Sequence, residues 1–152
     1  MDKQQFLIDL AASSRSDIGR IDFRNQSEPQ RIFSTVWSLE SYLSGGGFLD
    51  FFCYSGAAAS FAPTALRSIG AQACADIVER ALRALSAESL PDTPAAREQL
   101  VDSLDDDMRA AFDDLDAEFY EYPDDLTDLL FAYVASQPAI FGEVPLPERE
   151  RE

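Results

Sequence analysis

Carboxylates are the side chains best suited to chemistry in this sequence, which contains 28 aspartates and glutamates and no histidine. Paired acids such as Asp113 with Asp116 or Glu118 could share acid–base catalysis or bind a divalent cation. Without histidine, however, the commonest general base and metal ligand is missing. The calcium-binding pattern D-x-[DN]-x-[DN]-G is missing as well, and the acids are expected on an outer helical face without a pocket. We therefore predict no catalytic residue, no metal site, no cofactor and no enzymatic activity.

The glycine run and the two cysteines offer no stronger site. Gly45-Gly46-Gly47 lacks the G-x-x-x-x-G-K-[ST] pattern of a phosphate loop, so a tight turn is its predicted role. Cys53 and Cys74 lie among small and apolar residues, and a chain of 152 residues needs no disulfide to hold a core. We predict two buried free thiols.

Negative charge is concentrated in the second half of the chain. Residues 1–76 carry 8 acidic and 6 basic side chains, residues 77–152 carry 20 and 6, and the net charge is −16. The densest stretch, residues 102–128, contains a single basic residue, Arg109. The acids of this stretch, which we predict to bind a basic partner, are Asp102, Asp105, Asp106, Asp107, Asp113, Asp114, Asp116, Glu118, Glu121, Asp124, Asp125 and Asp128. They would repel phosphate, so we expect no direct binding of nucleic acid or of an anionic membrane.

The density of these acids is close to that of phosphates in DNA. A single helix over residues 102–128 would be about 40 Å long at ~1.5 Å per residue, with one acid per ~3.4 Å, which is the phosphate spacing along one strand of B-DNA. Solvated helices usually interleave Lys or Arg at i+4. Here the i+4 pairs are like-charged, namely Asp102/Asp106, Asp114/Glu118, Glu121/Asp125 and Asp124/Asp128. The alternative of an ordinary solvated surface that only keeps the protein soluble stays open.

Apolar residues at helical spacing predict helices for nearly the whole chain. The clearest start is Ser27-Glu28-Pro29-Gln30, which has the Ser-x-x-Gln form of a capping box with a proline in the first turn. The run Gly45-Gly46-Gly47 is expected to end this helix. The other helices expected before the acidic stretch are a weak one around residues 6–10, one with Pro63 in its first turn and Gly70 at its end, and one over residues 71–85. Residues 47–54 are expected to form a short buried helix or a tight helical turn, and a strand stays possible there although no partner strand is visible.

The elements that carry the acids occupy the last third of the chain. An apolar stripe predicts either one helix over residues 94–122 or two helices, broken near Asp105 or Asp113. Asp124 is expected to cap a last helix that ends before Pro138.

Together these segments predict an all-α fold, a compact single-domain bundle of about six to eight helices over residues 1–142. Residues 143–152, which are acidic and contain prolines, are expected to form a flexible tail. The N-terminal residues carry Asp2 and Asp9 and lack the apolar run of an export signal. No apolar stretch approaches the roughly 20 residues of a membrane span. We therefore expect a cytoplasmic protein without membrane contact.

Several short motifs occur in a fixed order between residues 32 and 141. They are Gly46-Gly47-Phe48 with Phe51-Phe52 and Ser55-Gly56, then Ala65-Leu66-Arg67-Ser68-Ile69-Gly70-Ala71, then Leu115-Asp116-Ala117-Glu118-Phe119-Tyr120. Together they resemble a bacterial family of mostly unknown function whose namesake is a DNA mimic that blocks a helix-turn-helix transcription factor. The resemblance implies an all-helical fold, a homodimer and DNA mimicry. The chain departs from the family at Gly45, where the family usually has asparagine.

Three functional hypotheses follow. The first is an acidic protein-binding module, a DNA mimic that occupies the DNA-binding surface of a transcription factor or another basic DNA-binding protein. The alternative is an immunity or antitoxin protein that inhibits a basic nuclease or toxin. Binding to a basic active site would require the same negatively charged surface. An adjacent toxin gene would favour this alternative. An enzyme is the third hypothesis and has the weakest support.

Overall fold

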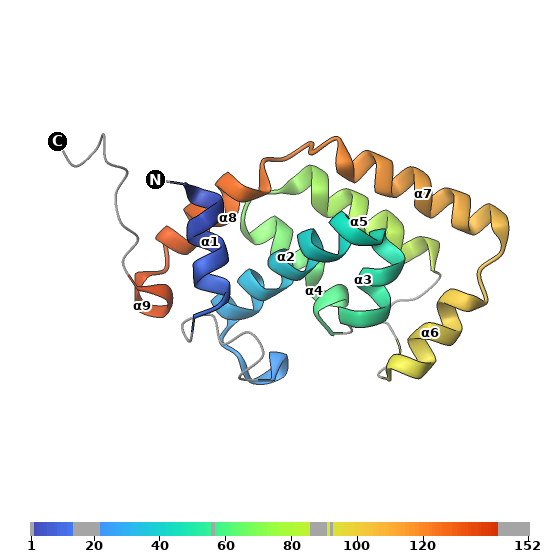
Figure 1. The fold of residues 1–152 in the computed structure, drawn as a ribbon, viewed down its shortest axis with the longest axis horizontal. Coiled ribbons are helices and arrows are strands. Elements are labelled where there is room, and N and C mark those ends of the chain that lie inside the picture. The colour runs from blue at the N-terminus through green and yellow to red at the C-terminus, as the bar shows by residue number, and fades with distance from the viewer. Residues whose placement is uncertain (1, 14–21, 56, 86–90, 92, 143–152) are drawn as a thin grey trace.

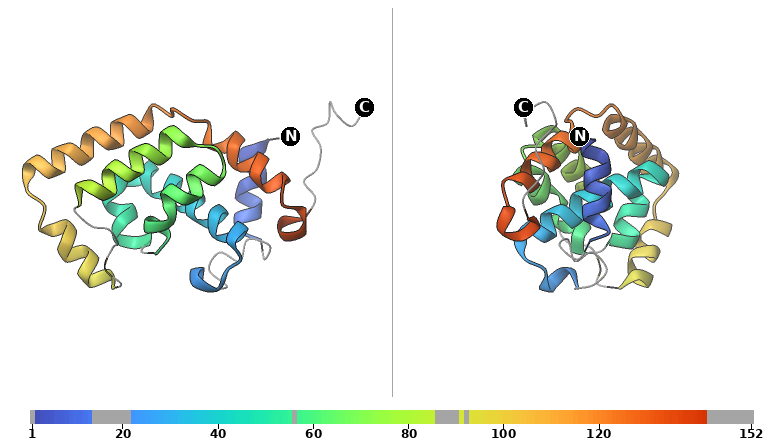
Figure 2. Two further views of the ribbon diagram at one scale, coloured as in Figure 1. Left: turned by 180° about the vertical axis from the view of Figure 1, so that it is seen from behind. Right: turned by 60° about the vertical axis from the view of Figure 1, so that its left-hand side comes forward.

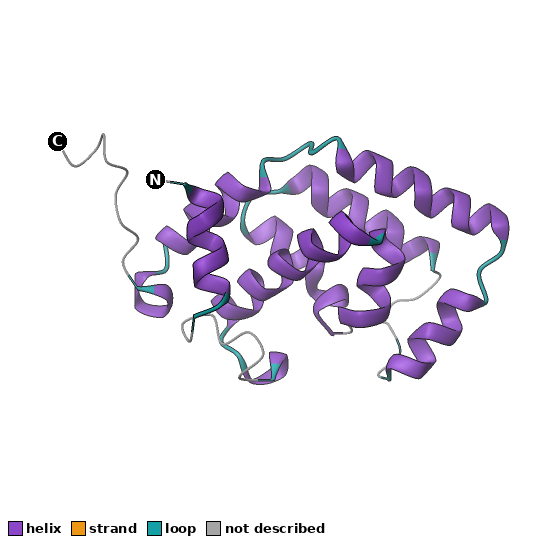
Figure 3. Cartoon of the chain, viewed as in Figure 1, coloured by secondary structure: helices purple, strands orange, loops and turns teal. Residues whose placement is uncertain are grey.

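The computed structural model describes residues 2–13, 22–55, 57–85, 91 and 93–142, and every regular element in these ranges is a helix (Figure 1, Figure 3). In chain order they are α1 (Lys3–Ala11), the 3-10 helix η1 (Phe23–Asn25), α2 (Glu28–Gly45), α3 (Gly47–Ser55), α4 (Ala57–Ser68), α5 (Gln72–Ala84), α6 (Pro94–Asp102), α7 (Asp106–Tyr120), α8 (Leu126–Ala135) and α9 (Pro138–Phe141). Within these ranges, all the α-helices except α9 have nine or more residues. The predicted all-α fold class is confirmed.

Helix α2 lies at the centre of the structure. It contacts α3, α4 and α8, while α5 packs on α4 (Figure 1). Helix α1 packs on α8 near the N-terminus, and α6 contacts α3 at the opposite end of the molecule. Helix α7 packs on α5 and α3 at the outside of this arrangement (Figure 2). The outward face of α7 is therefore open to solvent.

Local signals set the limits of α2 as predicted. The Ser27 hydroxyl accepts a hydrogen bond from the Gln30 N–H (3.3 Å), and the Gln30 side-chain oxygen accepts one from the Ser27 N–H (3.1 Å), which completes the capping box. The helix ends at Gly45, and the short buried helix expected after the glycines is α3, which begins at Gly47. The buried apolar side chains of the two helices are Ile32, Phe33, Val36, Leu39, Leu43, Phe48, Phe51 and Phe52.

Helix α4 begins at Ala57, so the prediction that Pro63 lies in its first turn is wrong. A proline inside a helix removes one N–H donor and crowds the carbonyl four residues earlier, at a cost of about 3 kcal/mol. Packing of α4 against α2 and α5 offsets this cost. The alanines buried before the proline are Ala58, Ala59 and Ala62. The end of α4 is as predicted: Gly70 has a φ of +86°, and the following N–H of Ala71 bonds to the Leu66 carbonyl at 2.8 Å.

Residues 94–122 form two helices, α6 and α7, and the break lies near Asp105. Asp105 has an extended backbone, and its carboxylate accepts a hydrogen bond from the Met108 N–H at 2.8 Å. Leu104, between the two helices, is buried. This local cap and this buried anchor together separate the two elements.

Helix α8 is capped by Asp125, so the prediction of Asp124 as its cap is wrong. The Asp125 carboxylate accepts from the Asp128 N–H at 3.1 Å. The Asp124 carboxylate instead accepts from the Cys74 N–H at 2.8 Å, in the first turn of α5. Two adjacent acids therefore cap two different helices, a division that the spacing along the chain does not reveal.

The buried apolar side chains form a cluster with members from α1 to α9. The last helix was predicted to end before Pro138, and α8 does, but the short helix α9 follows it. Its Phe141 is buried with its ring centroid 5.7 Å from that of Phe33. Both cysteines are free, with Cys74 buried and Cys53 half-buried. The tail predicted over residues 143–152 lies outside the described residues.

Candidate interaction surface

Helix α7 carries its acids on the outside of the molecule because its apolar stripe faces inward. Phe112, Leu115 and Phe119 are buried, whereas Ala111 is exposed. Two of the predicted partner-binding acids, Asp116 and Asp124, are half-buried. The exposed ones are Asp102, Asp105, Asp106, Asp107, Asp113, Asp114, Glu118, Glu121, Asp125 and Asp128.

Two of the exposed acids are neutralised by bases from other helices. Both oxygens of Glu118 accept hydrogen bonds from the Arg80 guanidinium on α5, at 2.8 and 3.0 Å. Asp128 pairs with Lys3 of α1 at 2.9 Å. In both cases the hydrogen bond from the base lowers the pKa of the carboxyl. These two charges are already engaged within the fold.

Four of the predicted acids cap helices. Asp105 and Asp125 cap the helices that they precede, and both stay exposed. Asp116 and Asp124 act over long sequence distances: Asp116 accepts from the Phe48 N–H of α3 at 2.9 Å, and Asp124 accepts from the N-terminal turn of α5 as described above. The half-buried positions of Asp116 and Asp124 thus have a structural role.

The carboxyl of Asp116 lies in an unfavourable place for a charge. Burial raises its pKa, nearby Asp113 and Asp50 raise it further, and the hydrogen bond from the Phe48 N–H opposes the change. Gly47, with a φ of +82°, borders this carboxylate closely: a Cβ at Gly47 would lie 2.8 Å from the Asp116 Cγ and nearer still to Oδ2. The residue at position 47 must therefore be glycine for Asp116 to reach the α3 backbone.

The remaining six predicted acids have no ion pair and no side-chain hydrogen bond within the described part of the chain. We call them the unpaired acids: Asp102, Asp106, Asp107, Asp113, Asp114 and Glu121. Arg109, the one base in residues 102–128, donates to the Val101 carbonyl at 2.9 Å and forms no ion pair there. The charge of the unpaired acids is consequently left facing solvent.

Four of the unpaired acids form two doublets on α7. Asp106-Asp107 and Asp113-Asp114 are seven residues apart, which places them on nearly the same face about 10 Å apart along the axis at ~1.5 Å per residue. Of the other predicted acids, Asp116 and Glu118 also lie on α7, and the rest lie on α6, on α8 or in the connections. The single 40 Å helix considered for residues 102–128 is therefore not formed, and the similarity to DNA in average spacing does not apply.

The predicted repulsion between i and i+4 acids is mostly avoided. Only Asp114 and Glu118 lie within one helix, and Glu118 is paired with Arg80. Asp102 and Asp106 lie on different helices, Glu121 and Asp125 both lie in the connection between α7 and α8, and Asp124 lies outside α8, which contains Asp128. The interruption of the acidic stretch between α6 and α7 and again between α7 and α8 thus reduces the repulsion along it.

Two exposed acids outside residues 102–128 lie close to acids of that stretch. Asp50 of α3 and Glu98 of α6 are exposed, and Asp50 lies near Asp116. Burial raises the pKa of the Cys53 thiol, and the carboxylates of Asp50, Glu98 and Asp102 raise it further. Acids from α3 and α6 therefore gather around one thiol. Helical spacing within a single segment could not reveal this, because the helices meet only in the fold.

A further acid group surrounds the start of α5. Burial raises the pKa of Cys74 to about 12, and the adjacent Asp124 adds to the effect. Burial also raises the pKa of Glu40 on α2, and Asp125 contributes. A thiol with such a pKa stays protonated at neutral pH, so Cys74 is not a nucleophile.

A family model described as DMP19-like protein matches residues 24–137, about three quarters of the chain. The chain belongs to the DMP19-like protein family. The family suggested by the motifs is thereby confirmed. Neither a search of curated proteins nor a search of solved structures found a match.

In this DMP19-like protein, two of the sequence motifs form one structural unit. Gly47 and Phe48 of the first motif contact Asp116 of the last motif, as described above. The rings of Phe48 and Phe119 meet edge to face with centroids 5.8 Å apart. The Tyr120 hydroxyl donates to the Leu43 carbonyl at the end of α2. The motifs therefore hold α7 against the turn between α2 and α3.

Exposed aromatic side chains accompany the acids of the DMP19-like protein. Tyr120 and Tyr122, at the end of α7 and just beyond it, are 45% and 55% exposed, and Tyr54 of α3 is 66% exposed. Tyrosine is enriched among the residues that dominate protein–protein binding energies. This composition suits a protein partner.

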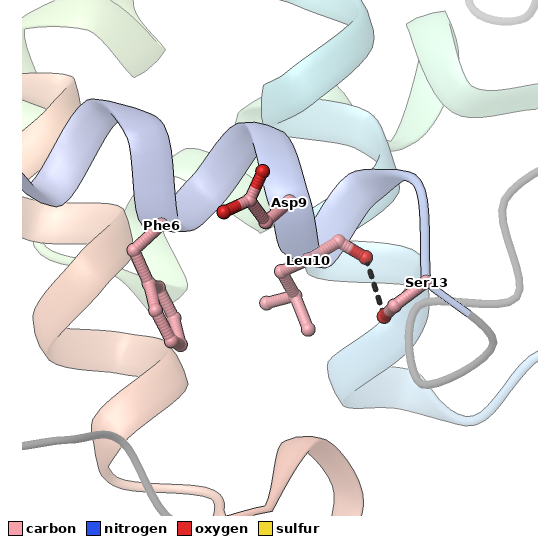
Figure 4. A pocket seen from close by; sticks show the side chains of 4 residues that line it. All are labelled: Phe6, Asp9, Leu10 and Ser13. Atoms are coloured by element: carbon pink, nitrogen blue, oxygen red, sulfur yellow. Dashed lines mark hydrogen bonds between the residues drawn. The ribbon is translucent and has the colours of Figure 1, made fainter.

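A hollow of about 200 Å³ lies beside α1, lined by Phe6, Asp9, Leu10 and Ser13 (Figure 4). Its lining is largely apolar, and the Ser13 hydroxyl donates to the Leu10 carbonyl at 2.8 Å. Among the described residues, Asp9 is the single ionisable side chain in that lining. Among the described residues, no group of three His, Cys, Asp or Glu side chains is placed to hold a metal ion, and no helix has the length and hydrophobicity to cross a bilayer.

Proposed function

We propose that this DMP19-like protein is an acidic protein-binding module that acts as a DNA mimic. Its unpaired acids would occupy the DNA-binding surface of a transcription factor or of another basic DNA-binding protein in the cytoplasm. The observation that carries the proposal is the set of six exposed carboxylates on and beside α7 that no base of the described residues neutralises. Family membership supports it independently.

The charge arrangement explains how such a module would work. Carboxylates held on a packed helix keep their positions, so a partner's lysines and arginines meet charges that are already in place. The net charge of −16 would accelerate encounter with a basic groove and repel DNA itself. The function proposed is binding and inhibition, with no catalysed reaction, and the resemblance adds a homodimer as the binding unit.

The direct test is a competition experiment. The immobilised full-length protein is incubated with lysate of its source organism at low salt, and the proteins that elute as salt rises are identified. Each candidate is then purified, and its binding to this protein is measured with and without the DNA that the candidate recognises. We expect DNA to displace this protein from its partner and binding to weaken steeply with salt.

Matched variants make the test specific to the α7 surface. Asp113→Asn with Asp114→Asn removes two unpaired acids, and Asp9→Asn with Asp22→Asn removes two exposed acids far from α7 in the chain. At ~0.5 kcal/mol per charge, the first variant should lose about fivefold in affinity and the second much less. Equal effects of the two variants, binding indifferent to salt, or simultaneous binding of DNA and this protein would refute the proposal.

A further inference from the structure

Asp116 differs from the other acids of α7 in what its carboxylate touches. It is half-buried, and it accepts a hydrogen bond from the Phe48 N–H at 2.9 Å. Phe48 is the second residue of α3, where the backbone N–H groups have no acceptor within the helix. The carboxylate of Asp116 supplies that acceptor from a helix that lies 68 residues further along the chain.

The glycine turn between α2 and α3 is shaped to admit this carboxylate. Gly47 has a φ of +82°, which L-residues rarely adopt, and a Cβ there would meet the Asp116 carboxyl group. The same helical turn of α7 makes two more contacts with this region, through the ring of Phe119 and the hydroxyl of Tyr120. The three side chains fix the rotation of α7 about its own axis.

The rotation of α7 determines which acids face outward. Both doublets lie on this one helix, so a rotation of α7 about its own axis would turn Asp106-Asp107 and Asp113-Asp114 together, away from the direction in which they now face solvent. Asp113 lies almost one turn before Asp116 and is close enough to affect its carboxyl group. Because Asp113 and Asp116 lie on the same helix, a change in how Asp116 holds α7 also moves the doublet.

We infer that Asp116 is a positioning residue: by binding the glycine turn it sets the orientation in which α7 presents its acid doublets, and it does not itself contact the partner. The inference rests on the proposed function, because it concerns the presentation of the same surface. The glycine turn between α2 and α3 thereby helps to set the orientation of the acids on α7. It also removes Asp116 from the predicted set of partner contacts.

The test compares substitutions that separate charge from hydrogen-bond acceptance. Asp116→Asn removes the charge and keeps an oxygen that can accept from the Phe48 N–H, whereas Asp116→Ala removes both. Asp113→Asn is the matched control, because it removes one unpaired charge from the same helix. We expect Asp116→Asn to keep the wild-type affinity within about 1.5-fold and the wild-type salt dependence, while Asp113→Asn weakens binding about 2.3-fold, at ~0.5 kcal/mol per charge.

Loss of the acceptor should have a larger effect than loss of a charge. Asp116→Ala and Gly47→Ala, studied well below their thermal unfolding midpoints, should both lose about tenfold or more in affinity with every unpaired acid intact. A purely structural role would leave the affinity of the folded variants unchanged. If neither variant folds, the comparison of Asp116→Asn with Asp113→Asn decides the matter alone.

Amide exchange at Phe48 tests the hydrogen bond without any partner. The amide should be protected in the wild type and in Asp116→Asn and should exchange faster in Asp116→Ala. The inference is overturned if Asp116→Asn loses as much affinity as Asp113→Asn, or if folded Asp116→Ala binds like the wild type. If Asp113→Asn with Asp114→Asn has no effect on binding while Phe48 protection behaves as expected, the proposed function fails and the structural contact stands.

Discussion

Helices α5 and α7 lie side by side on the outside of the molecule and use their charged residues differently (Figure 2). On α5, Asp76 and Glu79 are both paired with Arg67 of α4, at 2.9 and 2.8 Å, and Arg83 lies 3.4 Å from Glu79. Within the part of the chain that the structure describes, the two acid doublets of α7 have no such partners. The base available there, Arg109, bonds to a backbone carbonyl of α6 instead.

This difference separates an ordinary solvated helix from one that presents charge. Interleaved acids and bases, as on α5, neutralise each other at the surface and add little to stability. Doublets of one sign, as on α7, leave a field that extends to an approaching partner. The Arg80–Glu118 pair is the place where the two patterns meet, because α5 there neutralises an acid of α7.

The largest expected effect is on stability, and it tests how firmly α7 is packed against the rest of the fold. Phe119→Ala removes a ring that is 1% exposed and packed edge-on against Phe48. We expect it to lower the free energy of unfolding by about 3–5 kcal/mol, because the cavity left behind cannot fully close. Chemical denaturation measures it, with the exposed Asp114→Ala as control, expected within about 0.5 kcal/mol of the wild type. A loss below about 1 kcal/mol for Phe119→Ala would mean that α7 is only loosely attached.

A smaller effect, on binding affinity, should follow from removing the ion pair between α5 and α7. Arg80→Gln frees Glu118 and adds a seventh unpaired acid to the surface, so affinity for the partner should rise about twofold at low salt. Arg83→Gln is the matched control, because it also removes one positive charge but leaves Glu79 paired with Arg67. Titration calorimetry or a similar binding measurement can compare the two. A decrease in affinity for Arg80→Gln would contradict the contrast between the helices.

The smallest expected effect is the pH dependence of stability caused by Asp116. Its pKa is raised in the folded protein, chiefly by burial, so ionisation disfavours the folded state, and stability falls as pH rises from the unfolded-state pKa of about 3.9 through the folded-state value. Asp116→Asn lacks this loss. It should be a few tenths of a kcal/mol more stable than the wild type near neutral pH, after allowance for solvent screening, and equal to it below about pH 4. Denaturant titrations at both pH values test this, and a variant less stable at neutral pH would show that the carboxylate charge is needed.

Features governed by neighbours in the chain could be predicted from the sequence. The Ser27–Gln30 capping box, the end of α4 at Gly70 and the buried stripe of α7 all depend on residues within about four positions of one another. The interior position of Pro63 could not be predicted, because packing of α4 against its neighbours offsets the local penalty. The short helix α9 has too few residues for a periodic signal.

Some features of the candidate surface are also visible in the sequence, and others depend on tertiary packing. The density of acids around α7 is visible in the sequence, and so is their isolation from bases within residues 102–128. The pairing of Glu118 with Arg80 and the capping of α5 by Asp124 could not be predicted, because both join residues that are far apart in the chain. The addition of Asp50 to the surface likewise depends on how α3 meets α7.

The sequence by itself determined the helical elements and the excess of negative charge, because hydrophobic periodicity, helix caps and composition are properties of neighbouring residues. Only the tertiary structure decided which carboxylates remain available to a partner. Neutralisation, capping and burial of a carboxylate depend on distances between helices that are far apart in the chain, and those distances arise when the helices pack.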